Sequence, residues 1–137
     1  MMNRLTDGLN FNAQALTLRA ERQRIIASNI ANADTPGYVA RDLNFAQALR
    51  EATSASRITG TSQLAPSDTS AQSTIDRVAR NLVYAVPSQT NLDGNTVDMD
   101  RERAAFAENA IKYESTLRFI NGQVRTMMDA IKGNSST

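Results

Sequence analysis

The strongest pattern in the sequence is a row of apolar residues toward its C-terminal end. Between residues 97 and 132, apolar side chains recur at alternating steps of four and three, from Met99 to Ile131. This spacing keeps one side of an α-helix apolar and is typical of a coiled coil. We therefore predict a long helix over 97–132. Its apolar seam includes Phe106, Tyr113, Leu117, Ile120, Val124, Met127 and Ile131.

A second long helix is predicted over residues 2–32. Its apolar residues form two rows on roughly opposite faces, and small alanines in the first row are suited to sit against the C-terminal seam. A helix that is apolar on two faces needs two partners. Because one C-terminal helix covers only one face, we expect the second row to contact other chains. The first row includes Leu9, Leu16 and Ile30, and the second consists of Phe11, Leu18 and Ile25.

The middle of the chain is expected to consist mostly of loops. Residues 51–75 contain 11 Ser or Thr and show no sustained period, which is typical of a loop. A short third helix is predicted over Asp42–Ala52, with Asp42 as its N-cap. The run Asn81–Val86 predicts a brief strand.

These elements together predict an all-α fold in which the long N- and C-terminal helices pair as a coiled-coil-like core. Three segments make up one helical domain. Residues 1–52 hold the first helix, a turn and the short helix, residues 53–96 form the polar, loop-rich middle, and residues 97–137 hold the heptad helix.

A turn motif follows the first helix. Pro36-Gly37 suits the centre of a type II turn, because Pro fixes φ and Gly accepts a positive φ. Asn and Asp side chains before it can bond back to nearby backbone groups. The pattern predicts a helix end followed by a tight turn. The motif consists of Asn29, Asn32, Asp34, Thr35, Pro36, Gly37 and Tyr38.

A second motif precedes the C-terminal helix. Asp93-Gly94-Asn95 predicts a turn, and Thr96 or Asp98 can cap the helix. Its oxygen-rich side chains raise the alternative of a calcium loop, but the glycine stands second instead of sixth and no Glu stands twelfth. We therefore expect no metal site. The motif consists of Leu92, Asp93, Gly94, Asn95, Thr96, Val97 and Asp98.

Composition narrows the function classes. The chain has no Cys and no His, which excludes thiol nucleophiles, Ser-His-Asp triads and Cys/His zinc sites and makes an enzyme a poor interpretation. The 15 Lys and Arg against 14 Asp and Glu do not favour nucleic acid. No apolar run is long enough to span a membrane, and the first residues lack the apolar region of a cleavable secretory signal. We expect no cofactor.

Residues 29–38 resemble the signature of bacterial flagellar rod and hook-family proteins, and they lie, as in that family, at the end of the N-terminal helix. Residues 92–102 and 40–45 resemble the proximal rod subunits in particular. The resemblance covers residues 1–52 and 81–132. The short chain also fits a rod subunit, since hook and distal rod proteins carry large inserted β domains.

The resemblance implies a structural subunit of the flagellar axial tube, which transmits torque for motility. It implies self-assembly by packing of the terminal helices, export through the flagellar type III export channel without a cleaved signal, and a place in the basal-body rod within the periplasmic space. The implied partners are copies of the chain itself, the rod proteins FlgC, FlgF and FlgG, the adaptor FliE and the export gate.

Two other interpretations remain open from the sequence. One is a different short rod subunit, similar to FlgC. The other, from a different class, is a soluble cytoplasmic coiled-coil adaptor or chaperone, which the long heptad seam also suits.

Overall fold

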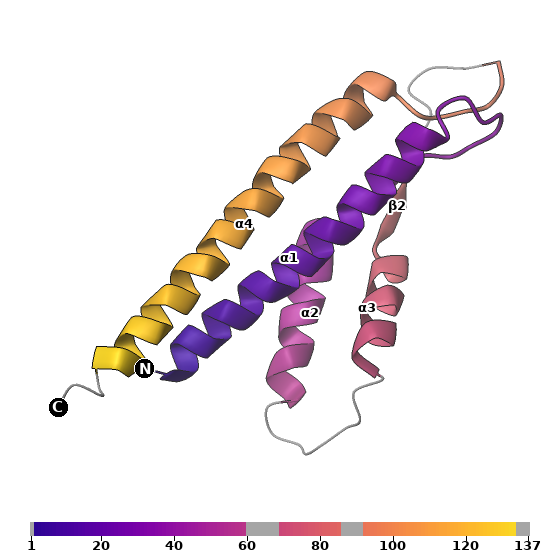
Figure 1. Ribbon diagram of the computed structural model, residues 1–137. Coiled ribbons are helices and arrows are strands. Elements are labelled where there is room, and N and C mark those ends of the chain that lie inside the picture. Colours follow the sequence, from indigo (N-terminus) through magenta and orange to yellow (C-terminus); the bar gives the residue numbers. More distant parts are fainter. Residues whose placement is uncertain (1, 60–68, 86–91, 134–137) are drawn as a thin grey trace.

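Two long helices run the length of the molecule. The computed structural model describes residues 2–59, 69–85 and 92–133. Helix α1 (Met2–Ala31) and helix α4 (Met99–Gly133) lie antiparallel, with the start of α1 and the end of α4 at the same end of the molecule (Figure 1). This arrangement confirms the predicted pair of long helices. No helix in the described part of the chain is both long and apolar enough to cross a membrane.

The start of α4 is set by its N-cap. The Oδ1 atom of Asp98 accepts hydrogen bonds from the backbone N–H groups of Asp100 and Arg101 at 3.2 and 3.3 Å. These bonds satisfy donors that have no partner within the helix. Asp100 and Glu102 add negative charge to the first turn, and Lys132 adds positive charge to the last, which complements the helix dipole.

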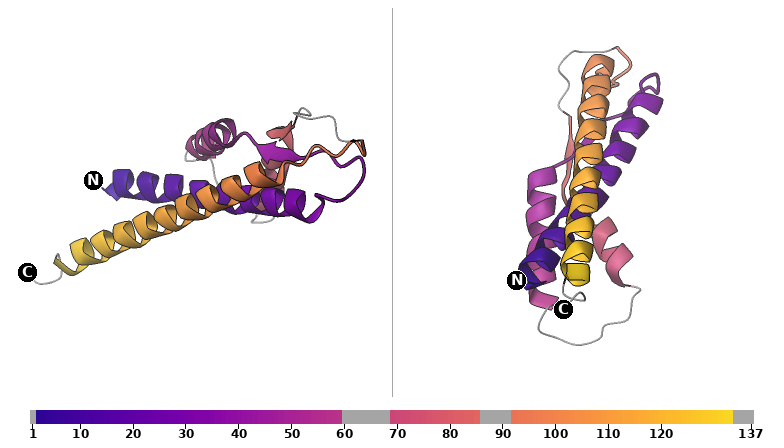
Figure 2. Two further views of the ribbon diagram at one scale, coloured as in Figure 1. Left: turned by 90° about the horizontal axis from the view of Figure 1, so that it is seen from above. Right: turned by 60° about the vertical axis from the view of Figure 1, so that its left-hand side comes forward.

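The smaller elements lie beside α1. They are β1 (Arg41–Leu43), α2 (Phe45–Thr59), α3 (Thr69–Arg80) and β2 (Leu82–Tyr84). Figures 1 and 2 show them on one side of α1, with α4 on another. The strands pair antiparallel, with Leu43 opposite Leu82 and Arg41 opposite Tyr84. The brief strand predicted over 81–86 is confirmed at residues 82–84 by β2, and Val86 lies outside the described residues.

The third helix predicted over Asp42–Ala52 exists as α2, but the prediction of its first residue and of its N-cap is wrong. Asp42 lies in β1, where its Oδ1 atom accepts from the N–H of Leu43 at 2.7 Å and is paired with Arg22 at 3.1 Å. Because the chain is still in the strand at Asp42 and α2 begins at Phe45, Asn44 is the N-cap, with its Oδ1 3.4 Å from the N–H of Gln47.

The middle of the chain contains more helix than we expected. Helix α2 continues to Thr59, and α3 forms within the Ser- and Thr-rich stretch interpreted as loop. Val78 of α3 and Leu82 pack against the buried core. Tertiary contacts of this kind override the modest intrinsic helix propensity of Ser and Thr.

The apolar core lies between α1 and the smaller elements. Leu18 and Ile25 of α1 are buried, together with Leu43 of β1 and Ala48 of α2. The expectation that the row Phe11, Leu18 and Ile25 faces other chains is therefore wrong for Leu18 and Ile25. The reason is that α2 and β1 cover this face of α1 within the same chain. Phe11, beyond that cover, remains 47% exposed.

Replacing Leu18 with Ala tests this core. Because Leu18 is only 2% exposed, Leu18→Ala should lower the free energy of unfolding by about 2–5 kcal/mol through lost burial and the cavity left behind. Denaturant unfolding followed by circular dichroism measures the change. Phe11→Ala is the matched control and should have a clearly smaller effect. Equal losses for the two variants would contradict the assignment of the core.

Candidate assembly interface

The two sequence motifs meet at the end of the molecule where α1 ends and α4 begins (Figure 1). The N–H of Gly37 donates to the carbonyl of Asp93 at 2.7 Å, and the N–H of Thr96 donates to the carbonyl of Tyr38 at 3.0 Å. Segments nearly 60 residues apart in sequence thus run side by side. The turn motif and the second motif form one junction.

Asn95 ties this junction together. Its side chain is 3% exposed, and its Nδ2 atom lies 2.7–2.9 Å from the carbonyl oxygens of Asn32, Ala33 and Thr35. All three carbonyls lie in the turn that follows the last residue of α1, Ala31. Asn95 therefore holds the turn after α1 against the segment that leads into α4.

Both glycines of the junction adopt the left-handed conformation. Gly37 and Gly94 each have a φ of +73°, a region that other residues enter only at a cost. The prediction of a positive φ at Gly37 is confirmed. A Cβ atom on Gly37 would meet nothing within 4 Å, so the requirement for glycine comes from the backbone and not from space.

Asn29 supports the junction from the last turns of α1. It is fully buried, its Nδ2 donates to the carbonyl of Arg41 at 2.6 Å, and its Oδ1 accepts from the N–H of Arg41 at 3.1 Å. The amide thus pairs with the edge of β1 as a neighbouring strand would. Tyr38 also donates to this Oδ1 at 3.2 Å. Burial raises the pKa of the nearby Glu102 carboxyl, and a hydrogen bond with Asn29 opposes that shift.

The other motif residues form further hydrogen bonds in or near the junction or face solvent. Asn32 donates to the carbonyl of Ser28 at 2.8 Å and accepts from the hydroxyl of Thr35 at 3.2 Å. The Oγ1 of Thr96 accepts from the N–H of Ala40 at 2.8 Å. In the described part of the chain, no group of three His, Cys, Asp or Glu side chains is placed to hold a metal. The residues Asp34, Pro36 and Leu92 are exposed, and Val97 is half-buried.

The most deeply buried residues of α4 form a polar row that faces α1. It follows a sevenfold spacing, in which Asn109 and Thr116 are buried and Glu102 and Gln123 are half-buried. The expectation that the alanines of α1 sit against the large C-terminal seam is therefore wrong for most of that seam. The helix is rotated so that the polar row faces α1, whereas most of the large residues of the neighbouring apolar seam do not.

Most of the predicted C-terminal seam is exposed beside this polar row. Its large members are 37–60% exposed, whereas Ile120 and Met127 are half-buried. On α1, Leu9, Leu16 and Ile30 are also half-buried. We call the exposed set the apolar row of α4. It consists of Phe106, Tyr113, Leu117, Val124 and Ile131.

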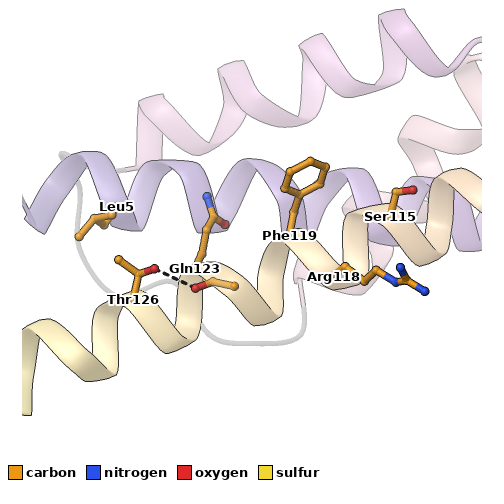
Figure 3. A pocket seen from close by; sticks show the side chains of 7 residues that line it. Leu5, Ser115, Arg118, Phe119, Gln123 and Thr126 are labelled. Atoms are coloured by element: carbon orange, nitrogen blue, oxygen red, sulfur yellow. Dashed lines mark hydrogen bonds between the residues drawn. The ribbon is translucent and has the colours of Figure 1, made fainter.

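Two grooves accompany the helix pair. One, of about 330 Å³, lies between Tyr113 of the apolar row and α1 residues that include Ala20 and Ala27. The other, of about 600 Å³, lies between Leu5 near the start of α1 and the part of α4 around Phe119. Figure 3 shows the side chains of Phe119 and Gln123 extending from α4 toward α1. Helix faces with apolar grooves of this kind are suited to receive other helices.

Replacing Asn95 with Ala tests the junction. The variant removes the buried donor to the carbonyl groups of the turn after α1, so we expect a loss of about 1–3 kcal/mol in the free energy of unfolding. Chemical denaturation measures it. Asn121→Ala, at an exposed position of α4, is the control and should change stability little. An unchanged midpoint for Asn95→Ala would contradict the role given to this side chain.

Comparison with known proteins identifies the family. The profile described as "Flagella basal body rod protein" matches residues 9–38. The chain is 46% identical to "Flagellar basal body rod protein FlgB" of Salmonella typhimurium, over 98% of this chain and 100% of that protein. The FlgB proteins of Yersinia enterocolitica and Escherichia coli are 45% and 44% identical, over 96% and 98% of this chain and 98% and 100% of their own lengths. The chain therefore belongs to the FlgB family of flagellar basal body rod proteins.

Proposed function

We propose that this chain is a structural subunit of the proximal rod and assembles by packing its long helices against neighbouring subunits. The observation that carries the proposal is the apolar row of α4. Five large apolar side chains, each at least 37% exposed, follow one side of a single helix. Contiguous exposed apolar surface marks sites of protein association.

The geometry of the row suits a lattice. From Phe106 to Ile131 it extends over 25 residues, or about 38 Å of helix. A neighbouring helix lying along this length would make many contacts in parallel, which suits a tube that carries torque. A contact between unlike surfaces that repeats with a screw rotation produces an open filament.

Family membership and the resemblance of the motifs support a fuller assignment. The subunit contacts copies of itself and the other rod proteins FlgC, FlgF and FlgG, and at the base of the rod it meets the adaptor FliE and the export gate. It leaves the cytoplasm through the flagellar type III export channel without a cleaved signal and takes its place in the periplasmic part of the basal body.

The other interpretations have less support. A FlgC-like subunit and a cytoplasmic coiled-coil adaptor or chaperone both fit long helices, but relatives that match nearly the whole chain at 44–46% identity are named FlgB. Presence of the chain in purified basal bodies separates a rod subunit from a cytoplasmic adaptor.

Placing a charge in the apolar row tests the proposal. In a strain lacking the natural subunit, Leu117→Asp should abolish or strongly reduce swimming and incorporation into basal bodies, because the carboxylate would be buried against a neighbour without a partner. The purified variant should unfold at nearly the same denaturant concentration as the unmodified chain, because Leu117 is already 40% exposed.

Ile111→Asp is the matched control. Ile111 is a 67% exposed apolar residue of the same helix, and its position lies about 120° around the helix from that of Leu117. This variant should keep most of its motility. Normal swimming by Leu117→Asp, with the protein present at its usual level, would refute the assembly surface proposed for α4.

A further inference from the structure

We propose that Asn109 is a positioning residue that keeps the apolar row of α4 turned away from α1 and available to neighbouring subunits. The inference rests on the proposed function, because it gives a reason for the orientation of the surface through which the subunit assembles. It concerns a residue that lies in neither sequence motif and in neither predicted apolar seam.

Asn109 forms hydrogen bonds to α1 that are possible at only one rotation of α4 about its axis. Its side chain is fully buried, and its Nδ2 donates to the backbone carbonyl of Arg19 at 2.9 Å and to Oε1 of Gln23 at 2.7 Å. Gln23 reaches back, with its Nε2 3.5 Å from the carbonyl of Phe106. Asn109 therefore contacts both the backbone and a side chain of α1, and Gln23 contacts both a side chain and the backbone of α4.

A second pair of amides acts in the same sense farther along the helices. The Nδ2 of Asn12 donates to Oε1 of Gln123 at 3.0 Å. Gln123 lies two heptads after Asn109, on the same row. Two directional contacts on one row fix both the rotation of α4 and its register along α1, which apolar contacts alone do not do.

These hydrogen bonds of Asn109 do not maximise the stability of the helix pair. The Oδ1 atom of Asn109 is buried and has no hydrogen-bond partner in the described part of the chain, and an unsatisfied buried acceptor costs free energy. A buried Asn in a helical seam is known to specify register at the expense of stability. Asn109 combines directional bonds to α1, which specify register, with an unpaired buried oxygen, which lowers stability.

The chain needs such a device because a second, fully apolar row lies next to the polar one. A modest rotation of α4 would turn this apolar row onto α1. Tyr113, which already borders a groove with Ala20 and Ala27, would then pack against that helix. That packing would cover the surface that neighbours require. The amides of Asn109 and Gln123 oppose this rotation, because they would lose their hydrogen-bond partners on α1 while remaining at least partly buried between the helices.

Replacing Asn109 with Leu in the full-length chain tests the inference, with thiol labelling of the dilute monomer as the readout. The chain has no Cys, so single reporters can be introduced at Leu117, which is 40% exposed, and at Thr116, which is 8% exposed. With Asn109 in place, the thiol of Leu117→Cys should react with an alkylating reagent severalfold faster than that of Thr116→Cys.

Asn109→Leu should change the two rates in opposite directions, slowing Leu117→Cys and accelerating Thr116→Cys severalfold, while the thermal midpoint stays equal or rises. The Asn109→Leu strain should swim less well than the unmodified strain, and the Asn109→Gln strain should swim better than the Asn109→Leu strain. Asn121→Leu makes the same chemical change at an exposed site and should leave both rates as they are. If Asn109 only stabilises the pair, both thiols will react faster and the midpoint will fall, which would overturn the inference.

Motility separates this inference from the proposed function. If Asn109→Leu exchanges the labelling rates but swims normally, the row does not need to be held outward and the inference fails, while the proposed function keeps its own test at Leu117. If Leu117→Asp swims normally, the proposed assembly surface fails, whatever the labelling shows.

Discussion

The arrangement of the whole chain depends on the hydrogen bonds between Asn95 and the turn that follows α1. They join the two long helices at one end, where the segment before α4 runs beside the turn after α1. Because α1 and α4 are each rigid, a junction at one end sets the direction of both over their full length. The left-handed conformations of Gly37 and Gly94 allow the two segments to run side by side.

From this junction onward, the two helices use their faces differently. Helix α1 is covered on one side by α2 and β1, whose contacts with Leu18 and Ile25 form the apolar core. On another side it meets the polar row of α4. Helix α4 has no comparable second cover within the described part of the chain, so its large apolar side chains are left for other molecules. In the assembly that we propose, α1 is held within the domain and α4 packs against neighbouring subunits.

Much of this fold could be predicted from the sequence, because helix periodicity and turn chemistry are local. The spacing of apolar residues predicted both long helices, and Pro36-Gly37 predicted the positive φ of Gly37. Periodicity shows which residues share a face but not what covers that face. For this reason periodicity alone assigns the row Phe11, Leu18 and Ile25 to other chains. It also predicts that the apolar seam of α4 is buried, whereas the structure buries the neighbouring row that contains Asn109.

The contacts of Asn29 and Asn95 could not be predicted either. Both residues stood in the two motifs, but their partners are backbone groups whose positions depend on the tertiary fold. The same holds for α3, whose Ser- and Thr-rich sequence has little helical preference of its own and forms a helix beside α2.

An image reconstruction of an intact basal body that contains this chain tests the central claim most directly. We expect the apolar row of α4, from Phe106 to Ile131, to be buried against helices of neighbouring subunits, with Asn109 still bonded to Arg19 and Gln23 of its own chain. A rod in which this row faces solvent, or in which it is packed on α1 of the same chain, would contradict the account.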